Sequence, residues 1–197
     1  MAGNLPQLLM RRPTLDDLEP LTAPAGYALR SFRPGDEASW GRVMDRAFEW
    51  EPGKAVFDEL MRSDPCYADE RVKVAVTTDS AAAGTVAATA SCWVVPKYGP
   101  QARMLHWVAT HPDHAGLGLG YQVSLAVLHH ALAEGCTQIF LLTDDFRTAA
   151  LVTYLRMGFE PVYTHPSHPE RWRLILKRFG RPEDFRTQLA SPLESFD

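Results

Sequence analysis

The segment whose residues most clearly indicate chemistry is a glycine-rich turn that joins a hydrophobic segment to a long helical pattern. Its glycines, Gly116, Gly118 and Gly120, occupy alternate positions. Glycine adopts positive φ and lets a ligand approach the backbone closely. Successive amides at a helix N-terminus, together with the helix dipole, favour phosphate groups. The turn therefore predicts a ligand that carries phosphate, although a tight turn alone would also use glycines here.

Two standard nucleotide-binding motifs do not fit this turn. A P-loop carries a Gly-Lys-Ser/Thr sequence, and no lysine follows Gly116 in the loop. A Rossmann glycine motif opens the first strand–helix unit of a parallel sheet, whereas this turn follows strands that we expect to be antiparallel. We therefore expect the phosphate to belong to another kind of ligand, and an NAD-binding oxidoreductase stays only as a rival hypothesis.

Strand and helix patterns place the turn in a mixed α/β fold. The β-rich segments predict seven strands, at 27–32, 72–77, 84–95, 102–110, 138–142, 159–163 and 172–177. Amphipathic periodicity predicts helices at 37–48, 57–61, 119–134 and 147–157. Three strands joined by turns imply an antiparallel meander before the glycines, and the strand–helix alternation after them implies one parallel pair.

The length of 197 residues fits a single domain. Residues 1–25 contain four prolines and no sustained period, so we expect an N-terminal arm, with regular structure starting only at Tyr27. Residues 26–180 then form the domain. Residues 181–197, rich in Pro, Ser and charge, form a C-terminal tail.

Composition argues against several kinds of partner. The formal net charge of -4, from 24 acidic and 20 basic residues, has the wrong sign for nucleic-acid binding. No apolar run is long enough to span a membrane, and the first residues lack a signal-peptide pattern. The three cysteines, Cys66, Cys92 and Cys136, have no metal-binding spacing and indicate reduced thiols. We expect a cytoplasmic protein without a metal, a monomer or a homodimer.

Two motifs resemble signatures of the GCN5-related N-acetyltransferases (GNAT). The first is Arg/Gln-x-x-Gly-x-Gly/Ala after the fourth strand, and here these positions hold Ala115, Gly118 and Gly120. The second ends in a helix with Leu-Tyr followed by Gly-Phe, which corresponds to Thr153-Tyr154 and Gly158-Phe159. The resemblance spans roughly residues 27–178, and it implies a GNAT-type mixed, largely antiparallel seven-strand sheet flanked by helices.

The resemblance implies that acetyl-CoA is the co-substrate, held almost wholly by the backbone. Its pantetheine would bond to main-chain groups of Val108 and Thr110. Its pyrophosphate would bond to the amides of the turn, Ala115, Gly116, Leu117, Gly118, Leu119 and Gly120. Ala115 stands where the family has Arg or Gln, so one side-chain contribution is missing. Arg147 stands where many relatives have Asn.

Transfer of an acetyl group to an amine needs an acid for the departing thiolate and a base for the ammonium. By resemblance, Tyr154 is the residue that protonates the thiolate. The alternative is that Tyr154 belongs to an amphipathic helix, with its hydroxyl at the surface.

Two histidines on one predicted strand, His106 and His111, are candidates for the base. Strand alternation places His106 and Val108 on one face, and a neutral imidazole titrates near pH 7. The segment is also similar to that of arylalkylamine N-acetyltransferases, in which a histidine at the position of His106 helps to deprotonate the amine. Met104 replaces the first histidine of that pair. The alternative is a structural histidine, and His111, beside Pro112, is expected to be a turn residue.

Other side chains have two interpretations each. Asp144 and Asp145 end a predicted strand and could attract a cationic amine, while Asp145 is expected rather to cap the following helix. Trp93, Tyr98 and Trp107 could line an acceptor pocket or belong to the core.

These features predict an acetyl-CoA-dependent N-acetyltransferase that acetylates a primary amine of a small molecule by direct attack in a ternary complex. The alternative function is a non-catalytic acyl-CoA-binding sensor module with the same fold.

Overall fold

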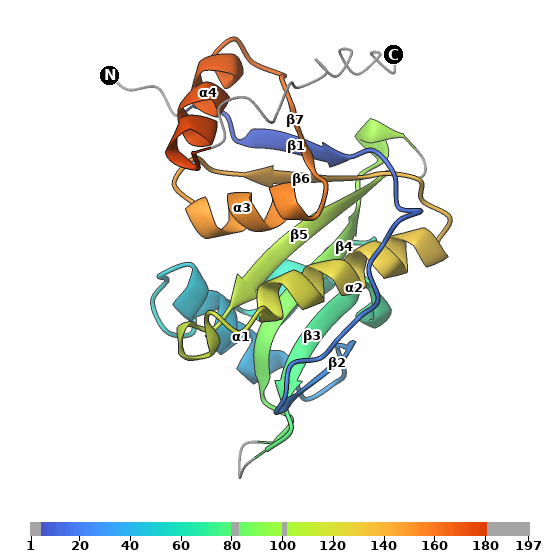
Figure 1. Ribbon diagram of the computed structural model, residues 1–197. Helices are drawn as coiled ribbons and strands as arrows, with labels where there is room; N and C mark the ends of the chain where they lie inside the picture. Colours follow the sequence, from blue (N-terminus) through green and yellow to red (C-terminus); the bar gives the residue numbers. More distant parts are fainter. Residues whose placement is uncertain (1–4, 80–82, 100–101, 181–197) are drawn as a thin grey trace.

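A computed structural model of the chain describes residues 5–79, 83–99 and 102–180. It contains one seven-stranded sheet with the strand order β2-β3-β4-β5-β6-β1-β7 (Figure 1). The strands are β1 (Leu8–Arg12), β2 (Tyr27–Ser31), β3 (Val72–Thr77), β4 (Val86–Val94), β5 (Arg103–Thr110), β6 (Ile139–Thr143) and β7 (Glu160–Val162). Only β5 and β6 pair in parallel, and the other neighbours are antiparallel. The predicted mixed, largely antiparallel seven-strand sheet is confirmed.

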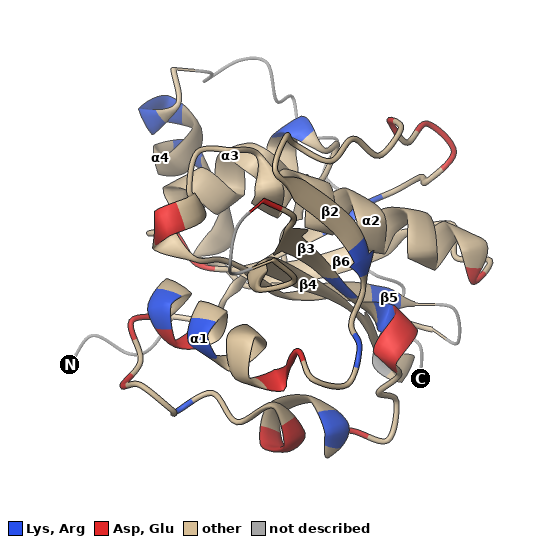
Figure 2. Ribbon diagram, turned by 90° about the horizontal axis from the view of Figure 1, so that it is seen from below, with Lys and Arg blue, Asp and Glu red and all other residues tan. Residues whose placement is uncertain are grey.

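Helices cover both faces of this sheet. They are α1 (Glu37–Ala47), α2 (Leu119–Ala133), α3 (Thr148–Arg156) and α4 (His168–Arg178), with a short π-helical turn at Asp58–Arg62. Figure 2 shows α1 on one side of the sheet and α2 and α3 on the other. Trp40 and Met44 of α1 belong to one buried cluster, whereas α2, α3 and α4 share a second cluster with β1, β4, β5 and β6. None of the described helices is long and apolar enough to cross a membrane.

The strand β1 corrects the expectation that residues 1–25 are only an arm. Leu8–Arg12 lies between β6 and β7 and is antiparallel to both, pairing Met10 with Leu141 on one side and Pro161 on the other. Leu8, Leu9 and Met10 are all buried. A strand covered on both faces has no alternating pattern, so its short apolar run gave no sequence signal of a strand.

A second correction concerns the predicted strand at 172–177, which is part of the helix α4. Its buried residues Trp172, Ile175 and Leu176 have the spacing of one helical face, and Pro169 occupies the first turn, where its missing N–H is tolerated. A short apolar run is compatible with a strand or a buried helix when periodicity is the only evidence. The sheet keeps seven strands because β1 supplies the one that the prediction placed at 172–177.

The segment after β1 runs along α2 (Figure 1). The hydroxyl of Tyr121 donates to Glu19 Oε2 at 2.8 Å, and the backbone N–H of Thr22 donates to Gln122 Oε1 at 3.0 Å. The sheet lies on the opposite side of α2, where Val123 and Val127 are fully buried. Residues 8–22 are therefore a packed part of the domain, in contact with the sheet and with α2.

Replacement of Met10 with Ala tests whether β1 is integral to the sheet. Met10 is fully buried, so the cavity left by Met10→Ala should lower the free energy of unfolding by about 2–5 kcal/mol. Urea denaturation measures the change. The control is Leu5→Ala, whose side chain is exposed and which should change stability by no more than about 0.5 kcal/mol. Equal stability of the two variants would contradict the placement of β1.

Candidate active site

The site begins where the parallel strands β5 and β6 separate. Only two residue pairs join them, Arg103 with Ile139 and Met104 with Phe140. From Leu105 onward, β5 has β4 on one edge and no strand on the other. Backbone N–H and C=O groups on an unpaired edge need other partners. The second half of β5 therefore offers main-chain hydrogen bonds to a ligand in the gap.

A bulge in β5 changes which side chains face the gap. The β4–β5 register passes from Thr89 opposite Ala109 to Ser91 opposite His106, and Trp107 has a φ of 48°. A positive φ is unusual for a bulky residue and marks local strain. This irregularity interrupts the alternation of side chains along the strand.

The prediction that His106 and Val108 share one face is therefore wrong. Val108 packs with the cluster on the α2 side of the sheet, to which Leu105 also belongs. Trp107 packs with the cluster on the α1 side, and the His106 ring contacts Trp107 and Trp93, with ring centroids 4.7 and 5.5 Å away. The bulge puts His106 and Val108 on opposite faces.

The glycine turn follows β5 and leads directly into α2. A 3₁₀ turn at Pro112–His114 comes first, and then Gly116 and Gly118 adopt φ values of 78° and 76°, with Gly118 as the N-cap of α2. The first amides of a helix have no partner within it, so those at the start of α2 are available to an anion. Ala115 differs, because its N–H already donates to the carbonyl of Pro112 at 3.1 Å.

One cavity of about 1150 Å³ unites the gap and the turn. Tyr154 lines this cavity, and so does every residue predicted to contact the co-substrate. These residues are Val108, Thr110, Ala115, Gly116, Leu117, Gly118, Leu119, Gly120 and Arg147. His106 is not among its lining residues. The wall also contains residues that the sequence analysis missed, namely Glu19, Thr22 and Pro24 before β2, and Arg46 and Glu49 at the end of α1. No local motif marks them, because only the tertiary packing brings these segments to the turn.

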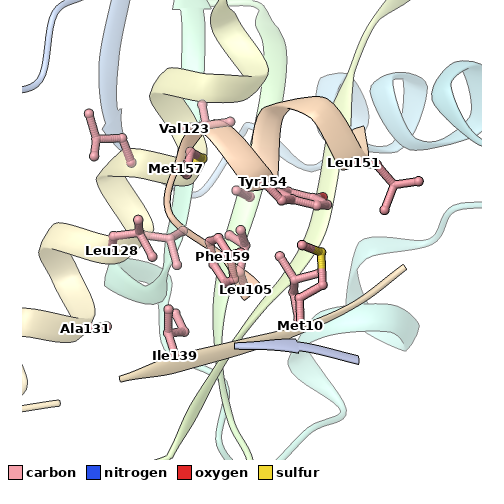
Figure 3. Packing of buried hydrophobic residues seen from close by; sticks show 14 of the residues in the cluster. Met10, Leu105, Val123, Leu128, Ala131, Ile139, Leu151, Tyr154, Met157 and Phe159 are labelled. Atoms are coloured by element: carbon pink, nitrogen blue, oxygen red, sulfur yellow. The ribbon is translucent and has the colours of Figure 1, made fainter. Parts of the chain in front are cut away.

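Tyr154 lies on α3, within the layer of side chains that packs between this helix and the strands (Figure 3). It is 7% exposed, so the alternative of a surface hydroxyl is wrong. Burial raises the pKa of Tyr154 to about 12, and the charge of Arg147 opposes that shift. The hydroxyl is therefore protonated at neutral pH and is a hydrogen-bond donor beside the cavity.

Arg147 lines the cavity and is held in place by an acid and two rings. Its Nε donates to Asp144 Oδ2 at 3.0 Å, and its guanidinium lies 4.7 Å from the ring centroid of Phe48 and 5.2 Å from that of Phe146. Such cation–π contacts fix the charge without neutralising it. Arg147 therefore links the end of α1 to the start of α3.

Asp145 does not cap α3, contrary to prediction. Its carboxylate accepts hydrogen bonds from Arg171 of α4, which hold the pKa of Asp145 below its usual value, and no side chain caps α3 at its N-cap, Arg147. His111 is a turn residue as predicted, because its Nδ1 accepts from the N–H of Asp113 at 3.3 Å.

His106 lies in a buried environment that disfavours its charged form. Burial lowers the pKa of His106 to about 4, and the charge of Asp64 only partly opposes this shift. Its Nδ1 is buried without a hydrogen-bond partner among the described residues, as is the hydroxyl of Ser91 directly opposite on β4. Buried polar groups without a protein partner commonly bind an ordered water. Because the pKa of His106 is about 4, its ring is neutral at pH 7.

The titratable side chains of this region show no arrangement for a metal. Within residues 5–79, 83–99 and 102–180, no three His, Cys, Asp or Glu side chains are grouped closely enough to hold one.

Known proteins with similar sequences are acetyltransferases. Mycothiol acetyltransferase from Nocardia farcinica is 32% identical over 150 residues, which cover 74% of this chain and 49% of that protein. The enzyme of that name from Saccharopolyspora erythraea is 31% identical over 156 residues, which cover 76% of this chain and 49% of the relative. The chain thus spans about half the length of the curated relatives it matches.

Solved structures show the same fold. A GCN5-related N-acetyltransferase from Sphaerobacter thermophilus matches with a TM-score of 0.58 and 24% identity over 80% of this chain and 49% of that one. A chain of the NatC complex bound to Gag peptide and CoA matches with a TM-score of 0.58 and 16% identity over 72% and 92%. The sequence model of the acetyltransferase (GNAT) family matches residues 29–159, which is more than half of the chain. The chain therefore belongs to the acetyltransferase (GNAT) family.

Proposed function

We propose that this protein transfers the acetyl group of acetyl-CoA to a primary amine of a small molecule by direct attack in a ternary complex. The observation that carries the proposal is the single cavity that joins the unpaired edge of β5, the amides at the start of α2 and the largely buried side chain of Tyr154. The acetyltransferase names of the relatives, and the CoA in one structural neighbour, support it.

The residues of the cavity fit the chemical parts of this co-substrate. Gly116 and Gly118 have no atom within 4 Å of the position of a Cβ, which leaves their backbone open to a diphosphate. Main-chain groups of Val108 and Thr110, on the edge that β6 leaves unpaired, suit the amides of a pantetheine arm. Arg147 supplies positive charge to the cavity.

Tyr154 supplies the acid of the proposed reaction. As the amine nitrogen forms a bond to the acetyl carbon and the carbon–sulfur bond breaks, Tyr154 donates a hydrogen bond and then its proton to the departing sulfur. A phenol with a pKa of about 12 is a weaker acid than an ordinary thiol, with a pKa of about 8.5, so full proton transfer from it is unfavourable. The pKa stays at about 12 even beside the charge of Arg147, so Tyr154 acts chiefly by donating a hydrogen bond to the departing sulfur, and the proton that the amine loses balances the one that the thiolate gains.

His106 is proposed to relay the proton of the amine as the hydrogen-bond acceptor of a water molecule, without accumulating as the imidazolium, because burial lowers the pKa of its ring to about 4. Direct contact is disfavoured because the ring lies beside Trp93 and Trp107 and outside the cavity lining. The cavity does reach the α1 side, where Ala47, Glu49 and Ala109 line it. A water bonded to both the Ser91 hydroxyl and His106 Nδ1 would hold the ring in one orientation.

A thiol-release assay tests the proposed function as a whole. The protein is incubated with acetyl-CoA and polyamines, aryl amines, amino acids, aminoglycosides or peptide N-termini, and free CoA thiol is measured. The names of the relatives add amines related to mycothiol. We expect amine-dependent thiol release. Calorimetric binding of CoA without release for any amine would instead identify a binding module.

The glycine turn gives the first prediction about individual residues. Gly118→Val should weaken CoA binding by roughly tenfold or more, because a β-branched residue loses about 1–2 kcal/mol in the left-handed region and the turn would relax away from it. Isothermal titration calorimetry measures the affinity. Gly135→Val is the matched control, since Gly135 has a φ of 81° and open space at the other end of α2. Equal affinities of both variants would exclude the turn from the binding site.

The proposed acid, Tyr154, gives the second prediction. Tyr154→Phe should lower kcat by roughly 100-fold or more, because removal of a general acid has an effect of this order. CoA affinity should change little, since the ring and its packing remain. The control Tyr163→Phe makes the same change on a tyrosine that does not line the cavity. Wild-type kcat in Tyr154→Phe, with chemistry rate-limiting, would remove this residue from the mechanism.

The environment of His106 predicts a pH dependence of stability. Between about pH 6.5 and 4 the unfolded chain binds a proton on this ring and the folded chain does not, so the wild type loses stability as the pH falls. His106→Gln lacks that loss, while His130 and His168, whose pKa values are also lowered, act equally in both proteins. Urea unfolding from pH 7 to pH 5 should therefore show a steeper decline for the wild type. Parallel declines would indicate an ordinary pKa for the ring.

A further inference from the structure

The side chain of Arg12 reaches from β1 to the end of α3. It is 8% exposed, and its Nη1 donates to the carbonyl of Met157, the residue that follows α3. Its other nitrogens are also bonded: Nε donates to the carbonyl of Thr14 at 2.9 Å, and Nη2 donates to Asp17 Oδ1 at 2.5 Å. All three donor nitrogens are occupied, so the guanidinium is fixed in one position.

Gly158 leaves the room that this guanidinium needs. A Cβ at Gly158 would lie 2.7 Å from Arg12 Nη1, closer than two such atoms can approach. The residue also has a φ of 79°, which suits the turn that ends α3. The N–H of the next residue, Phe159, donates to the carbonyl of Tyr154 at 3.0 Å. Arg12 therefore packs on a turn whose closing hydrogen bond is made to the backbone of Tyr154.

Side chains of α3 pack in the core, and charged side chains hold its two ends. The helix has nine residues, and its last carbonyls carry the partial negative charge of the helix dipole. A cation that hydrogen-bonds to such a carbonyl stabilises the helix end. At the other end, Arg147 is tied to Asp144. Arg12 is thus the charged side chain that holds the end of α3 nearer to Tyr154.

We propose that Arg12 is a positioning residue for acetyl transfer: it anchors the C-terminal end of α3 to β1 and so sets the position of the Tyr154 hydroxyl in the cavity. The inference rests on the acid role proposed for Tyr154. A displacement of a reacting group by about 1 Å can lower a rate by about 100-fold. A segment far from the glycine turn in sequence thereby contributes to the chemical step.

The test compares Arg12→Met with Arg11→Met, a matched control on the same strand. Arg11 precedes Arg12, so its side chain points to the opposite face, and its Nε has no partner among the described residues. Both variants lose one guanidinium from β1. We expect Arg12→Met to lower kcat by roughly tenfold or more, with CoA affinity by calorimetry close to that of the wild type. Arg11→Met should keep the wild-type kcat.

Two further readouts separate positioning from a general loss of structure. Amide hydrogen exchange should become faster at Gly158 and Phe159 in Arg12→Met, while α2 keeps its protection. In a Tyr154→Phe background, Arg12→Met should have no further effect on kcat, because the two residues act in one step. If Arg12→Met does not fold, Arg12→Lys keeps the cation with one donor nitrogen in place of three and should show a smaller fall in kcat.

The outcomes distinguish the inference from the proposed function. A normal kcat in Arg12→Met, or in Arg12→Lys if Arg12→Met does not fold, overturns the inference alone when Tyr154→Phe is impaired. The inference alone is also overturned if Arg12→Met lowers kcat by the same factor in the wild-type and in the Tyr154→Phe background. A normal kcat in Tyr154→Phe overturns the proposed acid and the inference with it.

Discussion

The separation of β5 from β6 after two residue pairs is the constraint on which the site depends. In a continuous sheet the backbone of Val108 and Thr110 would be satisfied by a neighbouring strand and closed to any ligand. Because β6 diverges, that backbone borders a cavity instead, and the helices that follow β5 and β6 both begin beside it. The opened sheet thus places the first amides of α2 and the hydroxyl of Tyr154 around one space.

The bulge at Trp107 adds a second division within the same strand. It assigns Val108 to the side of α2 and α3, and leaves His106 and Trp107 on the side of α1. In a regular strand the side chains alternate, so His106 and Val108 would lie on one face and Trp107 on the other. The bulge therefore leaves Val108 on the face that borders the glycine turn. An aromatic group lies on the other face and consists of Phe48, Trp50, Trp93, His106 and Trp107.

The parts of this arrangement that were predictable from sequence are those specified by local chemistry. The glycine turn, the amphipathic helices at 37–48 and 119–134, and the order of strands around them follow from conformational preference and periodicity, and the structure confirms them. The strand β1 was not predictable, because its short apolar run does not alternate and its partners lie far along the chain. The helix α4 does carry a signal, the helical spacing of Trp172, Ile175 and Leu176 after Pro169, which the strand interpretation of residues 172–177 overlooked. The bulge at Trp107 was also not predictable, since its positive φ is imposed by the register with β4 and not by the residue type.

The position of β1 has a consequence for the order in which the chain assembles. Leu8 pairs with Thr143, and Leu9 with Val162, so β1 precedes both of its neighbours in the chain and stays without them until most of the domain has been synthesised. Until then its apolar side chains lack a core, and an unpaired apolar strand is the kind of segment that joins other chains. Contacts between distant parts of a chain also form slowly. The half of the sheet formed by β6, β1 and β7 therefore cannot close until residues 139–162 have been made.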